Sequence, residues 1–192
     1  MGIAKKTSLF LFRSLTSSFG QVQLPPLEKS IEDPSTGLNV QPGFEVDLVY
    51  KVNKGKYGSW IAMAFDQKGR LTVSDQGGAG TFSIEIPQPG QPLDESKIKK
   101  LNVKSSQWGM LYAFDHLYMM GNKTLTRAKV LPDGNLGPAE VIAPMNGGGE
   151  HGPHSIIVSP DGKNLYVIAG NYTHLPDYQK TRIRDNWKDD YL

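Results

Sequence analysis

The chain has 192 residues, of which 38% are hydrophobic and 21% charged, and its formal net charge is +2. These values are typical of a soluble globular protein and exclude a chain that is disordered throughout. The basic residues are spread out, with no aromatic-interleaved stripe, so nucleic-acid binding is unsupported. Because the chain has no cysteine, disulfides and thiolate metal sites are excluded.

The N-terminus has the features of an export signal. Lys5 and Lys6 form a basic start, and a small-x-small cleavage pattern ends at Gly20, although Arg13 interrupts the apolar run between them. We therefore expect a signal peptide over residues 1–20 and a periplasmic or secreted protein. The alternative is a disordered cytoplasmic leader. No other segment has the apolar length that a membrane span requires.

Residues 21–41 are rich in proline, serine, glutamine and acidic groups, which predicts a linker or extended lead-in to a domain over residues 42–192. Alternating apolar side chains predict a first strand over residues 43–50. Further strands are expected over residues 81–86, 98–103, 124–130 and 139–142, between three longer segments that resemble one another.

Each of these three segments is an apolar strand, a turn containing Asp, and a second apolar strand. They cover residues 59–75, 107–122 and 155–171. Asp-x-Gly and Asp-Gly supply the side-chain hydrogen bond and the positive φ that tight turns need. The spacing is regular, since Leu71 and Leu117 are 46 residues apart and Leu117 and Leu165 are 48 apart.

A recurrence of this length that holds about four strands is typical of a β-propeller blade. We therefore expect an all-β fold with about three four-stranded blades of a six-bladed propeller. A β-sandwich with chance similarity between its hairpins is the alternative. Propellers close a ring to protect their edges, so the chain reads as an N-terminal portion of a longer propeller or as one completed by oligomerisation.

Three ionisable groups lie close together in a glycine-rich loop: Glu150, His151 and His154. A histidine oriented by an acid is suited to general-base catalysis. The His-x-x-His spacing would also serve a metal such as zinc, with Glu150 as a third ligand. The alternative is structural, with a histidine that simply bonds to the backbone.

Other candidate residues lie at the ends of the repeated strands. Gln76, in the loop Asp75–Gly80, is a candidate contact to substrate or cofactor, while the loop as a whole lacks the Lys-Ser/Thr of a phosphate loop and predicts a structural turn. Asn171 could line a pocket or end a strand. Trp60 and Trp108 occupy equivalent repeat positions and are expected to pack between blades.

The third segment resembles the soluble glucose/sorbosone dehydrogenase family of six-bladed propellers, which use pyrroloquinoline quinone. The resemblance is carried by His151, then residues 159–162 (Ser-Pro-Asp-Gly), residues 165–167 (Leu-Tyr-Val) and residues 170–171 (Gly-Asn). It implies that His151 is the catalytic base that takes the substrate hydroxyl proton while hydride passes to the quinone.

More closely, residues 42–190 resemble the N-terminal part of the large propeller dehydrogenase-like proteins of planctomycete-type bacteria. The shared motifs are residues 43–46, 74–78, 147–154 and 169–171. The resemblance implies a sugar-like substrate, a quinone with calcium, and a cytochrome c as a candidate electron acceptor. It also implies that the residues holding the quinone come from later blades, so that this chain alone is inactive.

In this interpretation Glu150 or His154 orients His151 or binds substrate, and no residue is assigned to a metal. Two alternatives stay open. One is a metal-dependent propeller hydrolase of the lactonase type, built on Glu150 and the histidines. The other is a non-catalytic binding or scaffold propeller whose loops contact a partner.

Overall fold

A computed structural model describes residues 31–33, 37–44, 46–149 and 151–174. The expected signal peptide, most of the expected linker, Glu150 and the charged C-terminal tail lie outside these residues. Contacts divide the chain into two units, Met1–Val46 and Asp47–Leu192. Within the first unit, β1 (Ile31–Asp33) pairs antiparallel with β2 (Leu38–Val40), where the sequence predicted only an extended lead-in.

The strand predicted over residues 43–50 is wrong. The described residues of this stretch form no strand, and Phe44 and Leu48 are exposed. Alternation shows only that a segment has two chemically different faces, whereas a strand also needs a neighbour for its backbone hydrogen bonds. This segment has no such neighbour among the described residues.

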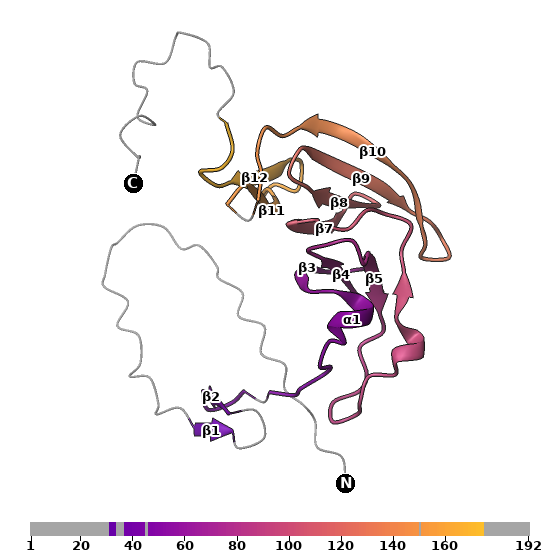
Figure 1. Cartoon of the computed structure of the whole chain (residues 1–192), viewed down its shortest axis with the longest axis vertical. Coiled ribbons are helices and arrows are strands. Elements are labelled where there is room, and N and C mark those ends of the chain that lie inside the picture. Colours follow the sequence, from indigo (N-terminus) through magenta and orange to yellow (C-terminus); the bar gives the residue numbers. More distant parts are fainter. Residues whose placement is uncertain (1–30, 34–36, 45, 150, 175–192) are drawn as a thin grey trace, which may run out of the picture. The chain divides into compact units, whose positions relative to one another are not determined.

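The described residues of the second unit form an all-β structure with three antiparallel sheets (Figure 1). The first sheet contains β3 (Trp60–Phe65), β4 (Leu71–Asp75), β5 (Thr81–Ile84) and β6 (Lys99–Lys100). The second contains β7 (Gly109–Ala113), β8 (His116–Met120), β9 (Thr124–Val130) and β10 (Leu136–Pro144). The third contains β11 (Pro153–Val158) and β12 (Leu165–Ala169). Two short helices are α1 (Lys54–Tyr57) and the 3-10 helix η1 (Glu95–Lys97).

Strands follow one another in chain order within every sheet, so each sheet is a simple meander. The first strands of the three sheets lie in a row, because β7 packs beside both β3 and β11. The sheets follow one another along an arc and do not close (Figure 1). The predicted all-β class is confirmed. The third sheet has two described strands, where a four-stranded blade was expected.

The turns predicted from Asp residues form, and hydrogen bonds within the β3–β4 turn stabilise it. In the β3–β4 turn, the Asp66 carboxylate accepts hydrogen bonds from the backbone N–H groups of Lys68 and Arg70, both at 2.9 Å. The β7–β8 turn has two residues, Phe114 and Asp115, and both have positive φ. That conformation matches the twist of a hairpin, although it is unusual for a bulky residue such as Phe114.

The interface between the first and second sheets forms one part of the core. Ala62 on β3 packs with Met110, Leu117 and Met119 of the second sheet, where the small alanine leaves room for the longer side chains. Burying a leucine or methionine side chain stabilises a fold by roughly 1.5–3 kcal/mol. The same interface holds a buried hydrogen bond of 2.8 Å between the Thr72 hydroxyl and the Tyr112 hydroxyl.

Two further clusters complete the core. Tyr118, Met120 and Leu125 on the second sheet pack against Ile156 of the third. The outer face of the first sheet is partly covered by an aromatic cluster around α1. It is formed by Tyr57, Val73, Phe82 and Ile84, with Tyr50 and Trp60 against them. The second sheet is therefore packed on both faces.

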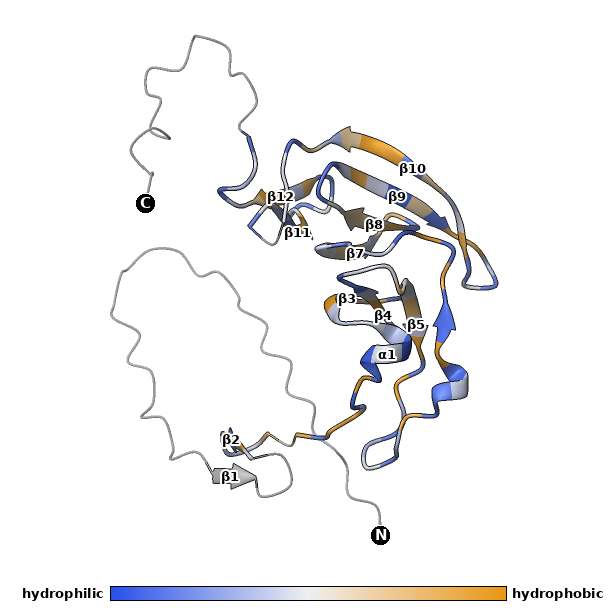
Figure 2. Ribbon diagram, viewed as in Figure 1, coloured by the Kyte–Doolittle hydropathy of each residue, from blue (hydrophilic) through white to orange (hydrophobic). Residues whose placement is uncertain are grey.

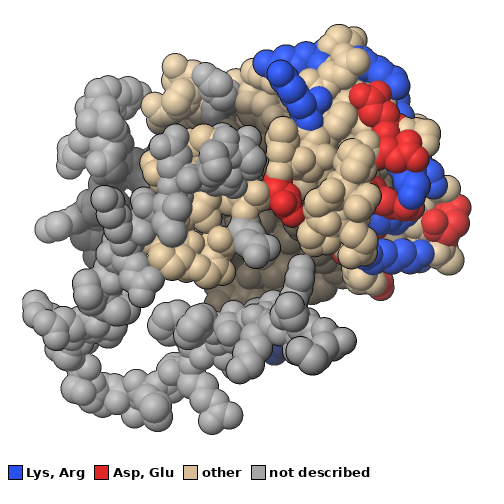
Figure 3. All heavy atoms as spheres, turned by 90° about the horizontal axis from the view of Figure 1, so that it is seen from below, with Lys and Arg blue, Asp and Glu red and all other residues tan. Residues whose placement is uncertain are grey.

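The outermost strands differ in how their edges are protected. The β6 edge is two lysines, and β10 carries proline residues and two register shifts, features that discourage further pairing. Figure 2 shows β6 and η1 as hydrophilic and β12 as partly hydrophobic. In the view of Figure 3, acidic and basic side chains are interspersed toward one side, and no single sign dominates. None of the helices in the described part is long and apolar enough to cross a membrane.

Candidate functional site

The candidate residues that the structure describes lie at one end of the sheets. Gln76 follows β4, His151 and His154 flank the start of β11, and Asn171 follows β12. Because the first strand of an antiparallel pair starts where the second ends, all four lie at the same end. We call this end the histidine rim. It comprises residues 75–80, 105–108, 121–123, 146–149, 151–154 and 170–174.

The loop that carries His151 is tied to the chain that follows β12. The His151 carbonyl accepts a hydrogen bond of 2.9 Å from the Tyr172 N–H, and the Gly152 carbonyl accepts one of 2.8 Å from the Gly170 N–H. The two segments approach so closely that a Cβ on Gly170 would lie 2.4 Å from the His151 carbonyl oxygen. Glycine is therefore required at position 170, and it fixes the backbone of His151.

The imidazole of His151 is exposed on this fixed backbone. Its ring lies beside the ring of Tyr172, with centroids 5.0 Å apart, and Tyr172 is itself exposed. An exposed histidine next to an exposed aromatic ring offers a polar group and an apolar surface side by side. That combination suits a ligand with both hydroxyl groups and C–H faces.

His154 has a different environment from His151. It is half-buried, and its ring meets Trp108 edge-on at a centroid distance of 6.0 Å. At this point β7 and β11 approach so closely that a Cβ on Gly109 would lie 1.7 Å from the His154 carbonyl oxygen. The two histidines thus contact different aromatic residues, and His154 belongs to the packing between sheets as well as to the rim.

The loop with Gln76 is held by the carboxylate of Asp75, which accepts hydrogen bonds from the N–H groups of Ser59 (2.6 Å) and Ala79 (2.8 Å). Burial alone would raise the pKa of Asp75, but backbone hydrogen bonds, chiefly that from Ala79, outweigh it and hold the pKa below its ordinary value. A Cβ on Gly58 would lie 2.1 Å from this carboxylate. The contacts agree with the structural role predicted for the loop, and Gln76 is exposed on it.

The backbone of Gln76 takes part in a hydrogen bond between two rim loops. Its carbonyl accepts a hydrogen bond of 2.7 Å from the Ser106 hydroxyl, which links the rim loops of the first and second sheets. Asn171 is exposed at the turn after β12. Gln76, His151 and Asn171 therefore present their side chains to solvent at the rim, while His154 is partly enclosed.

Three buried polar atoms at this rim have no hydrogen-bond partner within the described part. They are Trp108 Nε1, Asn122 Oδ1 and Thr173 Oγ1. Buried polar atoms are nearly always paired with protein, water or ligand. Sequence reasoning assigned Trp108 to packing and did not consider Asn122 or Thr173, because the lack of a partner depends on the folded neighbours of each residue.

The calcium ion is implied by the family resemblance alone. Among the described residues, no three His, Asp or Glu side chains are grouped to hold a metal ion. Asp75 is engaged by backbone amides. Glu150, the third ligand of the metal-dependent alternative, lies outside the described residues.

A cavity of about 440 Å³ lies at the opposite end of the sheets, where sequence reasoning placed no site. Its walls come from the turns after β3, β7 and β9, which are far apart in sequence.

Comparison of the chain with protein-family models, curated proteins and solved structures gave no match.

Proposed function

We propose that residues 47–174 form consecutive blades of a β-propeller. The support is geometric, since each sheet is a meander and the first strands β3, β7 and β11 lie in a row. Radial repetition of meander sheets is the arrangement of a propeller. The repeat of 46–48 residues in the sequence matches the step from one sheet to the next.

The two ends of the row carry apolar side chains that further blades would cover. On β3, Met63 and Phe65 are exposed. On the third sheet, Ile157, Tyr166 and Ile168 are exposed on the face turned away from the second sheet. Large exposed apolar patches mark surfaces that another element covers. This supports an arc that is continued in a complete ring.

We infer that the histidine rim binds a small hydroxylated molecule of the sugar type. The observation that carries this proposal is the gathering at one rim of an exposed His151–Tyr172 pair and three buried polar atoms that have no partner among the described residues. Aromatic rings and polar groups fixed on a rigid backbone are the usual lining of small-molecule sites. His151 is the residue best presented to such a ligand.

In this proposal His151 accepts the proton of a substrate hydroxyl, and Tyr172 packs against the C–H face of the substrate. Gln76 and Asn171 provide further hydrogen-bonding groups at the rim. Oxidation also needs an acceptor for the hydride, and the family resemblance implies a quinone for that role. In this proposal the chain is part of a sugar or aldose dehydrogenase-like propeller. Its described blades contribute the catalytic base and part of the substrate site.

The test is calorimetric titration of the 192-residue chain with D-glucose. His151→Ala should weaken binding about tenfold, because a ligand hydroxyl loses its partner. Lys163→Ala, at the other end of the β11–β12 hairpin, is the matched control and should leave binding unchanged. Equal affinity of wild type and His151→Ala would remove His151 from the site.

A second measurement tests the quinone. A ligand that binds the folded state raises the melting temperature by mass action. Pyrroloquinoline quinone with calcium should raise the melting temperature of the chain if the described blades contribute to its binding. Glucose binding without any such shift would mean that the described blades do not hold the quinone, and the quinone site would then lie in later blades.

A further inference from the structure

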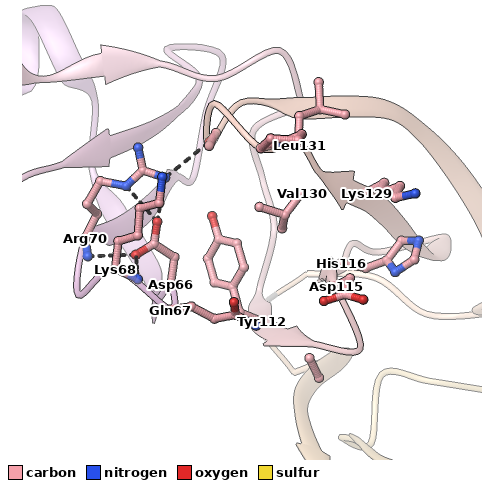
Figure 4. Close-up of a pocket in the computed structure, with 13 residues that line it drawn as sticks. Asp66, Gln67, Lys68, Arg70, Tyr112, Asp115, His116, Lys129, Val130 and Leu131 are labelled. Atoms are coloured by element: carbon pink, nitrogen blue, oxygen red, sulfur yellow. Dashed lines mark hydrogen bonds and ion pairs between the residues drawn. The ribbon is translucent and has the colours of Figure 1, made fainter.

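The cavity at the end opposite the histidine rim has the size of a small-molecule site. Its volume is about 440 Å³, and ligand pockets generally measure about 300–1,000 Å³. It lies between the β3–β4 turn of the first sheet and the β7–β8 and β9–β10 turns of the second (Figure 4). The cavity is thus formed by the packing of two sheets rather than by one mobile loop.

One wall is built around a partly buried ion pair. The Asp66 carboxylate contacts the Arg70 guanidinium at 2.7 Å, and the Asp66 side chain is only 6% exposed. Arg70 also donates through Nη2 to the Gly134 carbonyl at 3.2 Å, which joins the two sheets. These bonds hold the guanidinium in place, and its Nη1 has no hydrogen-bond partner within the described residues.

The middle of the cavity is apolar. The Tyr112 ring stands between the Asp66–Arg70 pair and Val130, with Leu131 above it in the view of Figure 4. The Tyr112 hydroxyl is occupied by its bond to Thr72, and burial raises the pKa of Tyr112. The tyrosine therefore offers the cavity the face of a neutral ring.

The charged residues that line the cavity carry a net positive charge. Asp66 and Arg70 neutralise each other. Lys68 and Lys129 also line the cavity and form no salt bridge within the described part, while Asp115 is the one remaining acid among the lining residues. Lys68 and Arg70 come from the same turn, and Asp133 of the β9–β10 turn lies within electrostatic range of Lys68. A fixed guanidinium N–H and the Lys68 ammonium therefore lie at one end of an apolar slot.

We propose that this cavity binds a small amphipathic carboxylate, such as an arylalkanoate. The carboxylate binds between Arg70 Nη1 and the Lys68 ammonium, where both donors are charged and the hydrogen bonds are strong. The apolar body lies over the Tyr112 ring and against Val130 and Leu131. This site is separate from the histidine rim and does not depend on the function proposed for it.

The test is an NMR titration of the ¹⁵N-labelled 192-residue chain with phenylacetate. Phenylacetamide is the matched uncharged probe, and acetate is the probe without a ring. We expect phenylacetate to shift the amide signals of Lys68 and Leu131, and both other probes to bind about tenfold more weakly or not at all. Lys68→Gln should weaken phenylacetate binding about tenfold. Lys97→Gln, an equal loss of charge on the exposed η1, should not.

Lys68 is exposed in a turn, so its substitution should leave the fold intact, and a thermal melt checks this. The proposal is overturned if phenylacetamide binds as tightly as phenylacetate, or if Lys68→Gln binds as wild type does. It is also overturned if acetate matches phenylacetate, because the apolar wall would then contribute nothing. Absence of any binding, or shifts confined to the histidine rim, would overturn it as well.

Discussion

The second and third sheets contain the same Leu-Tyr pair at equivalent positions, yet the two tyrosines have opposite environments. Tyr118 on β8 is 5% exposed, whereas Tyr166 on β12 is 53% exposed. Both rings stand on the face of their sheet that points along the arc. The third sheet covers Tyr118, and no described element covers Tyr166. The repeat therefore sets the strand and its register, while burial depends on whether a neighbouring sheet is present.

This comparison separates two kinds of residue. Side chains of the second sheet contribute stability because both faces are packed. Side chains on the outer face of the third sheet contribute little in this chain.

Leu117→Ala should destabilise the fold by about 2–5 kcal/mol, because Leu117 is fully buried between two packed sheets. Leu165→Ala, the equivalent change on the partly exposed β12, should cost clearly less. Chemical denaturation monitored by tryptophan fluorescence measures both. Equal losses would show that the two sheets are packed alike.

Gly109→Ala should destabilise by about 3 kcal/mol, since its Cβ would overlap the His154 carbonyl and force β7 and β11 apart. Gly78→Ala, where a Cβ would meet nothing within 4 Å, is the control. The same denaturation measurement applies. A neutral Gly109→Ala variant would contradict the close contact between the second and third sheets.

Asp75→Asn should cost about 1.5 kcal/mol near neutral pH, because an amide cannot accept all the hydrogen bonds of the carboxylate. The folded-state pKa of Asp75 is lowered. Its stabilising contribution is therefore complete above the unfolded-state pKa of about 4 and is lost as the pH falls through the folded value. Denaturation at a series of pH values should show wild type and variant converging below about pH 4. A constant difference down to the lowest pH would argue against a charged Asp75.

Ile168→Lys should change stability by no more than about 0.5 kcal/mol, because Ile168 is 59% exposed on the uncovered face. Met119→Lys is the contrasting change at a buried position and should unfold the domain. Thermal melts distinguish the two. A large loss in Ile168→Lys would mean that its face is covered in solution.

The hairpins and their order were predictable because local chemistry fixes them. Asp66 and its neighbouring glycine form the predicted turn, and the 46–48-residue spacing placed the strands correctly. The strand predicted at residues 43–50 failed because alternation does not supply a pairing partner. Sequence reasoning also missed β1 and β2, which are three residues each and too short to show a period.

The candidate site was predictable only in part. The repeat register placed Gln76, His151, His154 and Asn171 at strand ends, and these ends meet at one rim. His151 and His154 are distinguished by the aromatic rings that they contact, and these rings belong to residues far away in the sequence. Trp108 lies 46 positions before His154, and Tyr172 lies 21 positions after His151. The Arg70–Gly134 bond at the cavity opposite the histidine rim spans 64 positions, and no local pattern predicts it.

The most direct test of the proposed function is to map D-glucose binding by NMR on the 192-residue chain. The account predicts amide shifts at Gln76, His151 and Tyr172, with none at Lys68 or Leu131 on the opposite cavity. The same titration of His151→Ala should show these shifts greatly reduced. Shifts centred on the cavity, or an unchanged response in His151→Ala, would contradict the assignment of the histidine rim as the sugar site.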